Sequence, residues 1–171
     1  WSWAALRHPG TAGALRGVAW DGYGRCLAAT PDGLLFWNGM AWCAMDSRSL
    51  PRPNGIRFVH KVGPGRWLVG GDASMLAVYT TGGFSGTIQK PGAPEQYTAL
   101  SGDAEDMGVL AAAPEQGPLL LRAFIGRRWL RPCPVAGVAH IAGMTRVEDE
   151  RWLLAGNAGG GKGALVLYSP L

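Results

Sequence analysis

Short apolar runs separated by polar or glycine-rich turns follow one another along the whole chain. Four of these runs resemble one another, and their starts lie 41, 42 and 43 residues apart. Each run has about five residues, and none extends into a sustained 3.6-residue apolar period, so the pattern predicts short β-strands and no helices. The four runs are CLAAT (26–30), WLVGG (67–71), VLAAA (109–113) and WLLAG (152–156).

The neighbouring sequence predicts further strands on both sides of each run. A second apolar run follows after a turn, another lies upstream, and a closing run ends the first three units. In the first unit, Asn38-Gly39 links the last two runs, and this dipeptide between apolar segments is a strong hairpin signal. Each unit therefore reads as four short antiparallel strands. The closing runs are MAWCAM, FSGTI and RRWL.

Four-stranded units repeated about every forty residues predict an all-β fold, a β-propeller of about four blades. We expect a single domain over residues 1–171. The last repeat ends after its third strand, and WSWAAL (1–6) carries Trp3 where the other repeats carry Trp42, Phe84 and Trp129. We expect this segment to complete the last blade, either in a closed four-bladed ring or within a larger ring. The predicted repeats are 12–46, 55–90, 96–133 and 137–171.

Two stretches of the chain, DGLLFWNGMAWCAM and GRWLVGGDASMLAVYTTGG, carry a resemblance to a known repeat type. They are similar to propeller repeats of myxobacterial and related proteins, with the approximate pattern V-W-x-V-G-x-x-G-x-I-x-x-Y/W-x-G-x-x-W. Such repeats occur in surface or secreted proteins and beside bacterial serine/threonine kinases. The resemblance implies a binding or sensory role in a longer bacterial protein, with no ligand specified.

Composition excludes several classes of protein. The chain is 47% hydrophobic and 16% charged, with a net charge of +4, which describes a globular domain and gives no reason to expect a nucleic-acid partner. No uncharged apolar run is long enough to span a membrane, and no signal peptide is visible. The odd cysteine count matches no metal site or disulfide framework and slightly favours a cytoplasmic setting. We expect Cys26 and Cys43 in the core and Cys133 unpaired.

Near the C-terminus, Gly156, Gly161 and Lys162 have the spacing of a phosphate-binding loop, G-x-x-x-x-G-K. Such a loop needs a helix after it, so that the helix N-terminus faces the phosphates. Here β-prone ALVLYS follows, and Gly163 replaces the Ser or Thr that would bind magnesium. We therefore expect an enlarged hairpin loop and no nucleotide or other cofactor.

His60, His140 and Trp20 are the candidate ligand-binding residues. His60 and His140 stand two repeats apart on the predicted innermost strands, where Trp20 and Leu100 occupy the matching places. Innermost strands line a propeller channel, so these side chains are expected to form a ring that could hold an anion or a metal. The alternative is that each histidine bonds within its own blade. We assign no metal ligands and no catalytic residues, because no catalytic motif is present.

The sequence thus predicts a non-catalytic binding module with a protein or peptide partner. Its expected contact segments are loops on one face, and an incomplete ring would allow self-association. Two alternatives stay open: a lectin-like propeller that binds carbohydrate, and a hydrolase or lyase that uses the channel histidines. The expected contact segments are 46–55, 90–96, 131–137 and 157–163.

Overall fold

A computed structural model describes residues 15–50, 52–88, 92–102, 107–126, 128–148 and 150–170. Over these residues the chain forms antiparallel strands and two short 3-10 helices, η1 (Pro53–Gly55) and η2 (Asp72–Ser74). Neither helix is long or apolar enough to cross a membrane, and the described residues contain no other. The expected closing strand 1–6 lies outside the described residues.

Four antiparallel sheets follow one another in chain order. The first three each have four consecutive strands in sequential order, and β13 adds to the third sheet beside β11; the described part of the fourth sheet has three strands. The first sheet comprises β1 (Gly17–Trp20), β2 (Cys26–Thr30), β3 (Gly33–Trp37) and β4 (Trp42–Met45). The second comprises β5 (Ile56–Gly63), β6 (Arg66–Gly71), β7 (Leu76–Thr80) and β8 (Gly83–Thr87). The third comprises β9 (Glu95–Gly102), β10 (Gly108–Pro114), β11 (Leu120–Ile125), β12 (Arg128–Trp129) and β13 (Cys133–Pro134), and the fourth β14 (His140–Glu148), β15 (Arg151–Asn157) and β16 (Gly163–Tyr168).

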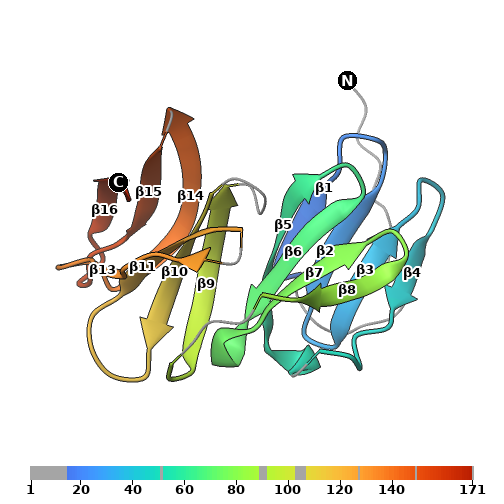
Figure 1. Cartoon of the computed structure of the whole chain (residues 1–171), viewed down its shortest axis with the longest axis horizontal. Helices are drawn as coiled ribbons and strands as arrows, with labels where there is room; N and C mark the ends of the chain where they lie inside the picture. The colour runs from blue at the N-terminus through green and yellow to red at the C-terminus, as the bar shows by residue number, and fades with distance from the viewer. Residues whose placement is uncertain are drawn as a thin grey trace.

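The sheets are the blades of a β-propeller, which confirms the expected fold class. The first strand of each sheet contacts the first strand of the neighbouring sheet, so β1, β5, β9 and β14 are the innermost strands. Successive sheets are in contact, and Figure 1 shows the first and second sheets in the right half of the view and the third and fourth in the left half. Each sheet therefore has a preceding face, toward the sheet before it in the chain, and a following face, toward the next.

Three apolar clusters fill the spaces between successive sheets. Side chains alternate between the two faces of a strand, so one strand supplies residues to both of its neighbours. Trp67 and Leu68, for example, lie in different clusters although they are adjacent in the chain. The main members are Leu27, Ala29, Trp67, Val69 and Tyr79 between the first two sheets; Phe58, Leu68, Leu76, Leu110 and Phe124 between the second and third; and Val109, Ala111, Trp152, Leu154 and Tyr168 between the third and fourth.

Two local features differ from the expectations. The Asn38-Gly39 hairpin forms, but its loop has four residues, because Trp37 pairs with Trp42 and the Asn38 amide oxygen accepts hydrogen bonds from two backbone N–H groups. In the third sheet the outer strand is split into β12 and β13, which both pair with β11. Pro132 lies between them and has no N–H to donate to a ladder.

A buried aspartate holds the turn that joins β1 to β2. The Asp21 carboxylate accepts hydrogen bonds from the backbone N–H groups of Tyr23 (2.7 Å) and Arg25 (3.1 Å) and from the Arg25 guanidinium (2.6 Å). Burial raises the pKa of Asp21, but these hydrogen bonds and the positive charge of Arg25 together outweigh it and leave the pKa below its ordinary value. The ionised form is therefore the one that the folded chain favours.

This pKa predicts a pH-dependent contribution to stability. A lowered pKa stabilises the fold above the unfolded-state value of about 3.9, and this stabilisation is lost as the pH falls through the folded-state value. We expect Asp21→Asn to lower the midpoint of thermal unfolding at pH 7, and the difference from the unmodified chain to shrink below about pH 4. Circular dichroism melts over a pH series measure this difference. A difference that stays constant down to acid pH would contradict the role assigned to the carboxylate.

Candidate functional site

Loops at one end of the propeller carry a cluster of polar side chains that forms the candidate site. Corresponding strands of the four sheets run in the same direction. The loops between second and third strands therefore lie at this end, together with the connections between sheets. These loops are β2–β3, β6–β7, β10–β11 and β15–β16. It is the lower end of the molecule in Figure 1, where η1 and η2 are drawn. We call it the loop end.

A network around Asp72 ties the second sheet to the third at the loop end. The Arg57 guanidinium donates to Asp72 Oδ1 at 3.0 Å, and the Gln96 amide donates to the same oxygen at 2.9 Å. Partial burial raises the pKa of the Asp72 carboxyl, but these two hydrogen bonds and the positive charges of Arg57 and Arg16 together outweigh it, so the pKa lies below its ordinary value. Asp72 is therefore a fixed negative charge that positions Gln96 at the start of β9.

A buried ion pair lies next to this network. Glu95 is only 6% exposed and accepts two hydrogen bonds from the Arg122 guanidinium, one of them from Nε at 2.6 Å. The Arg122 side chain is 15% exposed. A bidentate pair out of water holds both side chains in one geometry. The sequence analysis did not find this pair, although an arginine inside the apolar run LLLRAF signals a buried acidic partner.

The η2 loop between β6 and β7 is strained. Ala73 and Ser74 have positive φ values of 56° and 58°, a conformation that residues other than glycine rarely adopt. The strain is held by contact with the third sheet, because the Ser74 hydroxyl accepts a hydrogen bond from the Glu95 backbone N–H at 2.9 Å. Strained non-glycine residues concentrate at binding and catalytic sites.

A pocket of about 340 Å³ opens over these groups. Its polar lining comes from Arg52, Glu95, Gln96 and Glu115, so it presents both charges and an amide. Arg52 and Glu115 are exposed, while Glu95 and Gln96 are fixed by the contacts described above. The remaining walls are small or rigid residues, Ala73, Pro94, Ala113 and Pro114.

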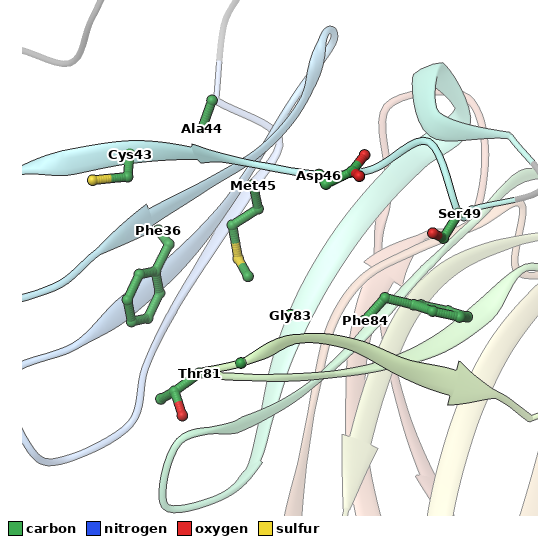
Figure 2. A pocket seen from close by; sticks show the side chains of 10 residues that line it. Phe36, Cys43, Ala44, Met45, Asp46, Ser49, Thr81, Gly83 and Phe84 are labelled. Carbon is green, nitrogen blue, oxygen red and sulfur yellow. The ribbon is translucent and has the colours of Figure 1, made fainter.

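A second hollow, of about 470 Å³, lies on the outer side of the propeller between the first and second sheets. Figure 2 shows Phe36 and Met45 of the first sheet on one side of it and Thr81 and Phe84 of the second sheet on the other. Phe36 packs edge-on against the buried Trp67 ring, with centroids 5.9 Å apart. The floor of this hollow is therefore part of the core, and its shape serves packing between the sheets.

The structure does not bring the two candidate histidines to one level. His60 pairs with Leu68 in β6, and Thr145 takes the matching place in β14 because it pairs with Leu153. His140 lies at the other end of β14, opposite Asn157, and is exposed. The spacing of 80 residues was misleading because matching positions of the second and fourth sheets lie 85 residues apart, as Trp67 and Trp152 do.

His60 has a contact that links two sheets. Its Nε2 lies 2.9 Å from the backbone oxygen of Gly102 in β9, so Nε2 carries the proton and donates it. Trp20 is 60% exposed and lies opposite Cys26, one register position beyond the level of His60. Leu100 is buried in the core between the second and third sheets. The expected ring of four side chains is therefore not formed, and whether His60, His140 or Trp20 binds a ligand stays a prediction.

The glycine-rich segment is a hairpin loop, as expected. It joins β15 to β16, and a strand follows where a phosphate-binding loop would have a helix. Gly159, Gly160 and Gly161 all have positive φ values, which glycine adopts at little cost. The turn is closed by the backbone hydrogen bond from Ala158 N to Lys162 O at 2.9 Å.

The exposure of the cysteines and arginines differs from residue to residue. All three cysteines are free; Cys26 and Cys133 are partly buried, but Cys43 is exposed on β4, so the expectation that it lies in the core was wrong. The arginines of the third sheet also differ in burial, because Arg122 is paired inward whereas Arg128 and Arg131 are exposed. Within the part of the chain that the structure describes, no three His, Cys, Asp or Glu residues cluster as metal ligands would.

Comparison with known proteins supports the class of fold. No protein-family model matches the chain, and no curated protein matches it by sequence. A solved structure described as the extracellular domain of the one-component system BT4673 from B. thetaiotaomicron matches 95% of this chain, with a TM-score of 0.67 and 15% identity. The WD40 β-propeller domain of Doa1 matches 95% of the chain with a TM-score of 0.50 and 11% identity.

These likenesses define the protein as a β-propeller. At such identities they show the fold alone. The chain spans 21% of the length of the first structure and 67% of the second. Both matched structures are therefore longer than this chain.

Proposed function

We propose that this propeller is a non-catalytic binding module and that it takes an extended polypeptide segment at the loop end. The observation that carries the proposal is the pocket between the second and third sheets, whose walls are fixed by the Glu95–Arg122 pair and the Asp72 network. A site whose side chains are held before binding loses little conformational entropy when a partner docks.

The lining of the pocket favours a polypeptide ligand. Gln96 offers an amide, and Arg52 and Glu115 line the same pocket with opposite charges. Peptide backbone carries donors and acceptors in alternation, and a mixed-charge site suits side chains of both signs. Pro94 and Pro114 keep the rims rigid and reduce the entropy lost on binding. The sensory role beside a bacterial kinase, which the repeat resemblance implies, belongs to this proposal.

The test is selection from a phage-displayed library of random dodecapeptides against the immobilised chain. We expect selected peptides to lose at least about tenfold in affinity, roughly 1.4 kcal/mol, when Arg52→Glu is introduced. Arg128→Glu makes the same charge change on an exposed residue of β12 and should leave affinity unchanged. Isothermal titration of synthetic peptides measures both. Equal loss in the two variants would reduce the effect to net charge and overturn the site.

Trp20 favours one other class of function. Its exposed indole could stack on a sugar, which is the lectin alternative. Quenching of tryptophan fluorescence by simple sugars, lost in Trp20→Ala, would establish that alternative. The hydrolase or lyase alternative would require turnover that disappears in His60→Ala or His140→Ala.

A further inference from the structure

The following face of the fourth sheet is uncovered. Leu165 and Leu167 in β16 are 76% and 60% exposed, and Leu153 in β15 lies beside them and is also exposed. The matching residues of the second sheet are Leu76 and Val78, because Tyr79 pairs with Trp67 as Tyr168 pairs with Trp152. Leu76 is buried against the third sheet. The fourth sheet thus has the apolar surface of an internal blade without the next blade upon it.

The preceding face of the first sheet is exposed along its inner strand and buried on the two strands beside it. Val18 and Trp20 are exposed, although Ala28 and Leu35 on the adjacent strands of that face are buried. Val18 pairs with Ala28 as Leu100 pairs with Leu110 in the third sheet, and Leu100 is buried against the second sheet. The same chain therefore exposes apolar residues on the two faces that one more junction would use, and its first and fourth sheets lie on opposite sides of the view in Figure 1.

The outer edge of the fourth sheet also lacks a feature that the other three sheets share. In each complete sheet an aromatic residue of the third strand pairs directly with an aromatic residue of the outer strand. In the fourth sheet Tyr168 holds the third-strand position, and the described residues supply no fourth strand. The three pairs, with their centroid distances, are Trp37–Trp42 (5.6 Å), Tyr79–Phe84 (5.8 Å) and Phe124–Trp129 (5.2 Å).

Chain order shows which segment fits that edge. At each junction the chain leaves the outer strand of one sheet and enters the inner strand of the next, as from β4 to β5. A strand that precedes β1 would therefore be the outer strand of the sheet that lies before the first sheet. Residues 3–6, WAAL, are similar to WCAM of β4 (Trp42–Met45), with Trp3 at the position of Trp42.

We propose that a second copy of this chain completes the fourth sheet. The first sheet of the partner covers Leu153, Leu165 and Leu167, and residues 1–6 of the partner pair with β16 so that its Trp3 lies opposite Tyr168. The first sheet of one copy thus packs on the fourth sheet of the other, in the way that successive sheets pack at three junctions within the chain. When each copy completes the other, two chains form one ring with two identical junctions. The proposal does not depend on the peptide-binding function of the loop end.

The test is the mass in solution, measured by light scattering and by sedimentation over a concentration series. We expect twice the 18.0 kDa of one chain. Leu165→Glu with Leu167→Glu and, separately, Val18→Glu with Trp20→Glu should each halve the mass, because the junction uses both faces. Met40→Glu changes a residue that is 86% exposed in the β3–β4 loop, outside both faces, and should leave the mass doubled. Circular dichroism establishes that each variant is folded.

Each outcome decides a part of the proposal. A single-chain mass for the unmodified protein at every concentration would overturn it, and so would a mass larger than two chains. A doubled mass that survives the change in the first sheet would mean that two fourth sheets meet each other, which also overturns it. Trp3→Glu should weaken association at least about tenfold, and no change would remove the role of residues 1–6.

Discussion

Replacing Trp67 by alanine is expected to cost about 3 to 5 kcal/mol of unfolding free energy, because a large core side chain is lost and its space cannot close. Trp67 is fully buried between the first and second sheets and packs against Phe36. Its indole N–H also donates to the backbone oxygen of Ala19 at 3.1 Å, across the junction between the sheets. One side chain thus supplies both apolar contact and a hydrogen bond between two blades.

Urea unfolding followed by circular dichroism measures this loss. Trp67→Phe should cost less than Trp67→Ala, because the ring is partly retained and the hydrogen bond, of about 1 kcal/mol, is what is removed. Met40→Ala removes apolar atoms from an exposed residue and should change the free energy of unfolding by no more than about 0.5 kcal/mol. A Trp67→Ala variant as stable as Met40→Ala would mean that the two sheets are not packed as described.

Glu95→Gln is expected to cost about 3 kcal/mol or more, because it leaves the guanidinium of Arg122 buried without a counter-charge. Glu95 and Arg122 are 6% and 15% exposed. Replacing both, as Glu95→Leu with Arg122→Met, should recover much of the stability, since burying no charge avoids the cost of removing two from water. The free energy of unfolding of both variants, compared with the unmodified chain, checks the prediction.

Asp46→Asn is the matched control for that pair. Asp46 and Arg48 form an ion pair with hydrogen bonds similar to those of Glu95 and Arg122, but their side chains are 58% and 91% exposed. Exposed pairs contribute little because water screens them. A loss in Asp46→Asn as large as in Glu95→Gln would show that burial is not the source of the effect.

The fold could be predicted from the sequence because the repeat fixes strand positions by spacing alone. β2 (Cys26–Thr30) coincides with the expected run, and β6, β10 and β15 differ from theirs by a residue at one or both ends. Trp67 and Trp152, which begin two of the expected runs, are fully buried between blades.

The arrangement of the site could not be predicted in the same way. His60 and His140 are 80 residues apart, whereas the matching residues Trp67 and Trp152 are 85 apart, so counting whole repeats placed His140 at the wrong level. Cys43 lies in an apolar run, which predicted burial. The run forms the outer strand β4, where Cys43 is exposed. The pairing of Glu95 with Arg122 joins residues 27 positions apart, and only the folded sheet brings them together.

Because strand residues alternate between two junctions, packing between blades also determines the order in which the blades unfold. Each blade is built from one continuous stretch of chain and contacts mainly the blades beside it, so its stability combines an intrinsic contribution with one from each junction. Among the four described sheets, the first and the fourth each have one of the three described junctions and are expected to unfold before the second and third. Cooperativity in this chain is therefore expected to decline from the second and third blades outward, and association through the ends would raise it.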